Sequence, residues 1–353
     1  MTYYPVVHPF LTKNDEKYLS NMVRGKGVYC YDNEGNEYLD AIGGLWNVVL
    51  GYGNEELVRE IEHQAKKMPF INLWSNTNEC LIRLAAKLIE MAGKSFSKVM
   101  YTCTGSEAVE LCVKVMRKYQ SIQGKYNKKY ILVFESSYHG TTYGALTATG
   151  LDKETYGPYS PMLSGFAYLS VPNNNNLEEQ LKNLERIFET SAEKIAGVII
   201  EPILAAAGVL PIPVTYLRRL QELCRKNDVI LAFDEITTGL YRTGQAFSYD
   251  NYDGLVPDLV CTSKALTGGY MPFGAVIIGD KIMNSICDED AIVHFSTQNG
   301  NLIAAATALK TLAVLDRDDY ASLVREKSKL VRSILDGKLM DISIISDIRI
   351  AGL

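Results

Sequence analysis

One lysine, Lys264, lies where a charged amine is difficult to solvate, between the apolar run DLVCT and the glycine pair of SKALTGGY. Burial disfavours the charged form of an amine, so a lysine there has a lowered pKa and is available as a nucleophile and a proton carrier. An isolated lysine is more commonly a surface residue. Its position after a strand-like run favours another role, and we expect Lys264 to hold an aldehyde cofactor covalently.

Asp234 follows VILAF, a run apolar enough to be a buried strand. A buried carboxylate needs a cationic partner, and an ion pair at about 4 Å is worth roughly 4 kcal/mol at an effective dielectric of about 20. That energy is sufficient to keep a heterocyclic nitrogen protonated, as an electron-sink cofactor requires. Two other interpretations stay open at this point: Asp234 pairs with Arg242, or it caps the turn that follows.

The segment CTGSEAVE places Thr104, Gly105 and Ser106 at a helix start. Free N–H groups and the positive end of the helix dipole favour an anion there, and a glycine lets that anion approach the backbone. We expect Gly105 and Ser106 to bind a phosphate, although a simple helix cap at Thr104 or Ser106 explains the same letters. The sequence contains no GxGxxG motif and no P-loop that could bind the phosphate instead.

Tyr138 and His139, in SSYHG, either offer an aromatic face to a flat ligand or fill the core. The GxSxG motif of many hydrolases is absent from the sequence, and so are HExxH and other paired metal-ligand spacings. A hydrolase triad and a metal centre are therefore poorly supported.

Short apolar runs, which alternate with helical stretches, must position these polar residues. The runs cover residues 98–102, 130–134, 198–201, 229–234, 259–262 and 275–278. Runs of this length, rich in Val and Ile, indicate an α/β fold with a mostly parallel sheet covered on both faces. Ligands gather beyond the carboxyl ends of such strands, and consecutive strand ends here carry Ser, Tyr, His, Glu, Asp and Lys to one rim.

The two ends of the chain have patterns of their own. Residues 27–41 predict a β-hairpin, because alternating aromatic residues flank the turn formers at 33–36. Residues 301–315 and 320–335 have the apolar spacing of helices, and residues 342–353 look like the opening strand of a further unit. We expect a C-terminal subdomain that begins here and is incomplete.

The composition of the chain limits its possible partners and its cellular compartment. The chain of 353 residues has a net charge of −5 and no cluster of basic and aromatic residues, which argues against a nucleic-acid partner. Its seven cysteines are scattered without a CxxC pair, which is typical of thiols in a reducing compartment, and no signal peptide is evident, so we expect a cytoplasmic protein. Residues 195–214 carry one charge, Glu201, but prolines interrupt them, so they predict a buried strand and loop rather than a membrane span.

Taken in order, these segments resemble the class III aminotransferases of the ω-amino acid type, pyridoxal-phosphate enzymes of fold type I. The matching segments are TGSEAVE (104–110), SYHG (137–140), EP (201–202), DEITTGLYRTG (234–244), SKALTGGYMPFGA (263–275) and TQNGN (297–301). GGLWNVVLGYGNEELVREI (43–61) resembles the family's N-terminal substrate segment, so the similarity covers essentially the whole chain.

The resemblance implies a domain organisation. A mostly parallel central sheet of the seven-stranded type, with helices on both faces, would form the large cofactor-binding domain at residues 48–301. A small α+β domain would be built from both termini, with residues 1–47 as its N-terminal segment and residues 302–353 as the start of its C-terminal part. Family members carry an arginine for the substrate carboxylate farther along, which we expect to lie beyond Leu353.

The resemblance also assigns residues to the cofactor, pyridoxal 5′-phosphate. Lys264 would form the Schiff base and Asp234 would hold the pyridine nitrogen, while Gly105 and Ser106 would bind the phosphate. These roles coincide with those inferred from the residues alone.

Further residues would surround the cofactor ring. Tyr138, with His139 beside it, would lie on one face and Ile236 on the other, and Glu201 would lie near the phenolic oxygen. Thr297 resembles the threonine that reaches the phosphate of the neighbouring subunit, which implies a homodimer with a shared active site.

Trp46 falls where the family lines its substrate pocket. The chain departs from the usual family pattern in EPILAAAGV, in GLYRTG and at Leu302, and these departures bear on substrate preference rather than on the cofactor. The implied function is a transaminase that moves an amino group from an ω-amino acid or primary amine to a 2-oxo acid such as pyruvate or 2-oxoglutarate. The alternatives are another reaction of the class, such as an aminomutase or a diamine or 7,8-diaminopelargonate-type aminotransferase, and a cofactor-binding chain without activity.

Overall fold

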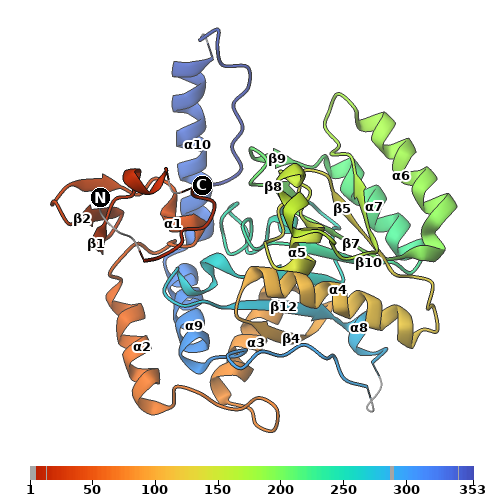
Figure 1. Ribbon diagram of the computed structural model, residues 1–353, viewed down its shortest axis with the longest axis horizontal. Coiled ribbons are helices and arrows are strands. Elements are labelled where there is room, and N and C mark those ends of the chain that lie inside the picture. The colour runs from red at the N-terminus through yellow and green to blue at the C-terminus, as the bar shows by residue number, and fades with distance from the viewer. Residues whose placement is uncertain (1–4, 13, 287–289, 341) are drawn as a thin grey trace.

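The computed structural model describes residues 5–12, 14–286, 290–340 and 342–353. A seven-stranded sheet forms its centre, and a three-stranded sheet and the helix α10 lie outside it (Figure 1). The central strands follow the order β4-β12-β11-β10-β7-β5-β6. Their bounds are Phe96–Thr102 (β4), Tyr130–Phe134 (β5), Phe166–Leu169 (β6), Ile195–Ile200 (β7), Ile230–Asp234 (β10), Leu259–Thr262 (β11) and Gly274–Gly279 (β12).

The central sheet is mostly parallel, as the apolar runs indicate. Neighbouring strands are parallel from β11 to β6, and β12 runs antiparallel to both β11 and β4. Each of the six apolar runs overlaps one of these strands. The seventh strand, β6, was not predicted, because its four residues are mostly half-buried at the edge of the sheet and form no long apolar run.

Helices separate the strands along the chain. The longer ones are α2 (Glu55–Lys67), α3 (Glu79–Ala92), α4 (Gly105–Ile122), α6 (Leu177–Ser191), α7 (Val214–Lys226), α9 (Leu302–Arg317) and α10 (Tyr320–Leu339). The shorter ones are α1 (Gly43–Trp46), α5 (Tyr143–Ala148) and α8 (Asp280–Met283). Helices α9 and α10 confirm the two helices predicted after residue 300.

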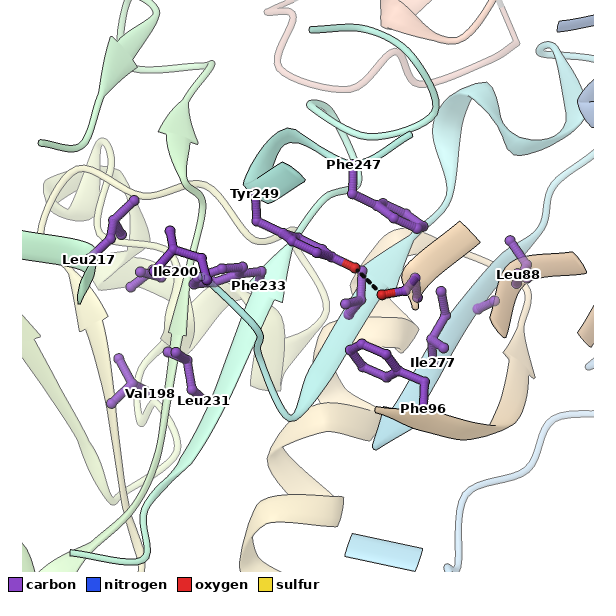
Figure 2. Packing of buried hydrophobic residues seen from close by; sticks show 14 of the residues in the cluster. Leu88, Phe96, Val198, Ile200, Leu217, Leu231, Phe233, Phe247, Tyr249 and Ile277 are labelled. Carbon is purple, nitrogen blue, oxygen red and sulfur yellow. Dashed lines mark hydrogen bonds between the residues drawn. The ribbon is translucent and has the colours of Figure 1, made fainter. Parts of the chain in front are cut away.

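Two hydrophobic layers cover the faces of the sheet because successive side chains of a strand point to opposite sides. In β10, Leu231 and Phe233 belong to the cluster that includes α3, α6, α7 and α9, whereas Ile230 and Ala232 belong to the cluster that includes α4, α5 and α8. Figure 2 shows the first cluster, where Tyr249 also donates a hydrogen bond of 3.1 Å to the carbonyl oxygen of Ala92. The strands are thus held rigidly between helices.

The outer sheet contains the predicted hairpin. Its strands are β1 (Met22–Lys26), β2 (Tyr29–Asp32) and β3 (Glu37–Leu39), and the turn between β2 and β3 is closed by backbone N–H groups of Glu34 and Asn36 that donate to the Asp32 carboxylate.

The apolar stretch at residues 195–214 forms β7, β8 (Ile203–Leu204), β9 (Leu210–Pro211) and the connecting loop, as the interrupting prolines indicate. Among the described residues, no helix has the length and apolar character needed to cross a membrane.

The strand predicted at residues 342–353 is wrong. The described residues of this segment, which run along α10 to the end of the chain, are irregular, and their only backbone pairing with a distant segment is a bond from the N–H of Leu353 to the carbonyl oxygen of Arg242. An apolar run becomes a strand only where another strand lies beside it to share hydrogen bonds.

Candidate active site

Five polar segments meet beyond the carboxyl ends of the strands, because each follows a strand of the same direction. They are Thr104–Ser106 after β4, Ser137–Gly140 after β5, Glu201 after β7, Asp234–Thr237 at the end of β10 and Lys264 after β11. Hydrogen bonds link neighbouring segments in pairs, as described below.

Lys264 begins a short 3-10 turn, Lys264–Thr267, directly after β11. Its Nζ donates to Thr237 Oγ1 at 2.5 Å and lies 5.0 Å from the centre of the Trp46 ring. Burial lowers the pKa of the Lys264 amine and the charge of Arg242 adds to this, whereas the acids nearby oppose it. The expected shift in a buried lysine is therefore found, and Thr237 fixes the direction of the amine.

Asp234 is 3% exposed and pairs with a histidine that is equally buried. The His139 Nδ1 lies 2.7 Å from Asp234 Oδ2, and the N–H of Ile236 donates to Asp234 Oδ1 at 3.0 Å. Burial alone lowers the pKa of His139, but the hydrogen bond and the charge of Asp234 outweigh it, so the pKa lies above its usual value. The hydrogen bond to Asp234 therefore favours the imidazolium form of His139.

This geometry bears on the alternative interpretations of Asp234 and His139. The pairing of Asp234 with Arg242 is wrong, because the Arg242 guanidinium donates to the carbonyl oxygens of Leu353 and Trp46 instead, at 2.7 and 3.0 Å. The alternative of a cap is compatible with the bond from the Ile236 N–H. His139 contacts the acid, and its Nε2 is buried without a hydrogen-bond partner among the described residues.

Glu201 is another buried ionisable group of the site. Its Oε1 accepts from the N–H of Tyr138 at 3.0 Å, and its Oε2 accepts from the N–H of Ala205 at 3.4 Å. Burial raises the pKa of Glu201 to about 7. The side chain therefore fixes the backbone of Tyr138 and carries a proton that is labile near neutral pH.

The start of α4 forms a cradle lined by backbone. Thr104 caps the helix by accepting from the N–H of Glu107 at 3.2 Å, so the cap and the anion site use different groups. Among the described residues, no hydrogen bond uses the N–H of Gly105 or Ser106. The Ser106 Oγ accepts from the N–H of Thr141 at 3.3 Å, which joins the helix start to the segment after β5.

Glycines make this cradle possible. A Cβ at Gly105 would lie 2.9 Å from the Ile236 side chain, and a Cβ at Gly140, where φ is +123°, would lie 2.1 Å from Ser106 Oγ. No larger residue fits at Gly140 unless Ser106 moves. Ile236 thus packs against the helix start, within the same loop that carries Asp234 and Thr237.

A cavity of about 700 Å³ lies next to Lys264, and Trp46, Thr237 and Arg242 contribute to its lining. Side chains of α10 and of the chain end close the other side, among them Tyr320 and Arg349. The cavity is large enough for a small organic substrate.

Thr297 is exposed, and no hydrogen bond links it to the other site residues within the described chain. Its neighbours Ser296 and Asn299 lie within 3.4 Å of Cys103 Sγ, just before the start of α4. The expected partner role of Thr297 is therefore compatible with its exposure, but its own chain does not bring it to Lys264.

Sequence reasoning missed Thr237 and Arg242 as site residues, although both stand in the quoted segment DEITTGLYRTG. The sequence does not indicate toward which part of the site a threonine or an arginine in a loop points. Their roles depend on how the loop folds back over β11.

Comparisons with known proteins give a consistent result. Residues 10–353 match the family model for aminotransferase class-III. A probable aminotransferase of Mycobacterium tuberculosis is 36% identical over 93% of this chain and 72% of its own length, and the putrescine–pyruvate aminotransferase of Pseudomonas aeruginosa is 31% identical over 89% and 71%.

Solved structures are also similar. A transaminase from the marine bacterium Virgibacillus superposes with a TM-score of 0.94 at 32% identity, covering 99% of this chain and 80% of that one. The ω-transaminase of Pseudomonas jessenii, solved in complex with PMP, has a TM-score of 0.92 at 32% identity, with the same coverage.

Proposed function

Because this chain belongs to the class-III aminotransferase family, whose members use pyridoxal phosphate, we propose that it transfers an amino group from an ω-amino acid or primary amine to a 2-oxo acid. The observation that carries the proposal is the buried Lys264 amine, which has a lowered pKa and lies beside a cavity of about 700 Å³. The cavity supports a small amine as donor, and the similar putrescine–pyruvate aminotransferase supports pyruvate as one acceptor.

The residues of the site fit the cofactor. The open N–H groups at the start of α4 suit a phosphate, and the glycines leave room for it. When bound, pyridoxal phosphate supplies an electron sink for the substrate carbon next to nitrogen. We assign Gly105 and Ser106 to the phosphate, Lys264 to the aldehyde carbon and Asp234 to the ring nitrogen.

Other residues orient the ring. Ile236 packs against Gly105 at the helix start, and its N–H donates to Asp234. Tyr138 lies in the segment that a hydrogen bond joins to Ser106 at the helix start. We therefore assign Tyr138 and Ile236 to the two faces of the ring. Glu201, which holds the Tyr138 backbone, is assigned to the phenolic side. His139 is assigned as a positioning residue that acts through Asp234, because its Nδ1 holds the carboxylate in place toward the ring nitrogen.

Lys264 moves the proton in this proposal. The lowered pKa of the Lys264 amine favours its neutral form, which is able to accept a proton from the substrate carbon and deliver it to the cofactor. Thr237 orients the amine through its hydroxyl. The Trp46 ring lies beside the amine and limits the space on the substrate side.

The substrate carboxylate needs a cation, and Arg242, a half-buried cation in the lining of the cavity, is the candidate. Its guanidinium lines the cavity, and its charge already acts on the pKa of Lys264. We therefore assign Arg242 to substrate recognition.

We also propose a homodimer in which Thr297 reaches the phosphate of the partner subunit. The exposure of Thr297 supports this role, and so does the adjacent exposed pair of Trp74 and Phe295, whose rings lie 5.7 Å apart. Sedimentation velocity of the wild-type protein tests the assembly, and a monomer with full activity would contradict it.

A half-reaction experiment tests the function. The purified chain is loaded with pyridoxal phosphate and mixed with putrescine or β-alanine while the cofactor absorbance is followed. A shift that needs the amine and reverses only when pyruvate or 2-oxoglutarate is added supports transamination. Reversal without any acceptor indicates a mutase instead, and a folded, cofactor-bound chain that responds to no amine of a broad panel is not an aminotransferase.

A further inference from the structure

A second cavity lies beside the amino ends of β5 and β6, whereas Lys264 follows the carboxyl end of β11. It has a volume of about 460 Å³ and is formed by the C-terminal end of α4, the loop that leads into β5 and the residues just before β6. Four of its lining residues are cationic and none is acidic. We call it the basic pocket, and its cations are Arg117, Lys125, Lys128 and Lys129.

This concentration of charge runs against the net charge of −5 of the whole chain. One acid lies close by, Asp228, and it is already shared between Lys125 and Lys281, at 2.5 and 3.0 Å. Lys128 is 7% exposed and donates to the carbonyl oxygens of Asn227 and Asp228, so no carboxylate pairs with it directly. The basic pocket therefore keeps an excess of positive charge.

Two cations of the basic pocket have N–H donors without an acceptor within the described chain. The Arg117 Nε donates to the carbonyl oxygen of Lys129 at 3.1 Å and its Nη2 to that of Ser164 at 3.1 Å, whereas its Nη1 has no hydrogen-bond partner among the described residues. Lys129 is exposed and makes no ion pair within the described chain. Burial lowers the pKa of Arg117, an effect that an anion would oppose.

The position of the guanidinium depends on a glycine. A Cβ at Gly165, where φ is +85°, would lie 2.7 Å from Arg117 Nη2. Backbone carbonyl groups accept from the guanidinium and the bare glycine leaves room for it, so a rigid cation is held at the wall of the cavity.

We propose that the basic pocket binds a small polyanion, a metabolite with two or more phosphate or carboxylate groups. The volume suits such a molecule, and the exposed rings of Tyr126 and Tyr130 at the rim can cover a flat part of it. Cations near the last turn of α4 also stabilise the C-terminal end of the helix dipole. That effect does not require Lys129 or the unbonded Nη1 of Arg117.

The site is separate from the cofactor phosphate. Helix α4 has 18 residues and joins the two places, so at a rise of about 1.5 Å per residue they are about 27 Å apart. A probe that binds here must therefore bind while the cofactor is present.

Isothermal titration of the cofactor-loaded enzyme with pyrophosphate tests the proposal, with citrate as a second arm to separate phosphate from carboxylate ligands. Sodium chloride at matched ionic strength is the background throughout. We expect Lys129→Gln to weaken the binding about tenfold, the usual loss for one charge-assisted hydrogen bond, and Lys129→Glu to abolish it. Lys329→Gln on α10 removes the same charge far from the basic pocket and should leave the affinity unchanged.

Equal affinity in wild type, Lys129→Gln and Lys329→Gln would overturn the proposal. So would binding that is seen only in cofactor-free enzyme, because the probe would then occupy the cradle at the start of α4. Binding of pyrophosphate but not citrate, or the reverse, identifies which anion the pocket prefers and supports it.

Discussion

The buried pair of His139 and Asp234 offers the sharpest test of how this chain controls its cofactor. Replacement of His139 by Phe keeps the volume close but removes the donor that lies 2.7 Å from Asp234 Oδ2. One oxygen of Asp234 then stays buried without a donor, and its charged form becomes less favourable. Less negative charge faces the ring nitrogen, so the electron sink weakens.

The size of the effect follows from the hydrogen bond. A bond to an ionised group contributes about 1.5–3 kcal/mol, which corresponds to a rate decrease of about ten- to a hundredfold if the charge matters mainly in the chemical step. We expect kcat to fall by that amount while KM changes little, since His139 does not line the cavity. His139→Asn, which retains a donor, should recover part of the rate.

Rapid-mixing absorbance of the amine half-reaction measures this rate directly. His63→Asn is the matched control, because His63 is exposed on α2, away from the site. A His139→Phe enzyme that stays within twofold of wild type while binding its cofactor would refute the reasoning, and the pair would then be structural only.

Three further predictions follow from individual contacts. Lys264→Ala should abolish the cofactor adduct that borohydride fixes and that mass spectrometry detects; an adduct at another lysine would contradict the assignment. Burial raises the pKa of Glu235 from 4.5 to about 7. Between these two pH values the folded chain keeps a proton that the unfolded chain loses. The free energy of unfolding should therefore fall by about 3 kcal/mol as the pH rises through that interval. Urea denaturation at about pH 5 and pH 8 should lose this dependence in Glu235→Gln, and an unchanged dependence would show that other groups cause it. Gly140→Ala should weaken cofactor affinity at least about tenfold by displacing Ser106, whereas Gly337→Ala, with nothing near its Cβ, should not; fluorescence titration with the cofactor compares them.

Sequence reasoning predicted the position of a residue correctly where that position follows from the end of a strand. Asp234, Glu201 and Lys264 each lie at or just after the end of a short apolar run, and parallel strands bring such ends to one edge of the sheet. The strand predicted at 342–353 failed for the complementary reason, since an apolar run needs a partner that the run itself does not specify.

The roles of loop residues were beyond the reach of the sequence. Thr237 lies 2.5 Å from the Lys264 amine because the chain after β10 turns back toward β11, and Arg242 reaches the carbonyl of Trp46 across the cavity for the same reason. Such approaches depend on the folded path of some ten residues, which no local period encodes.

That folded path is fixed by Glu235, the residue next to Asp234. Glu235 accepts from the hydroxyl groups of Thr238 and Ser248 at 2.6 and 2.7 Å and from the N–H of Tyr249 at 3.1 Å, so both ends of the loop are tied to one buried carboxyl group. Asp234, its neighbour, is directed instead to His139. Adjacent residues of an extended chain point to opposite sides, which lets one acid hold the loop while the other supplies charge to the site. The position of Thr237 against the Lys264 amine is therefore coupled to Glu235, although Glu235 itself does not touch the amine.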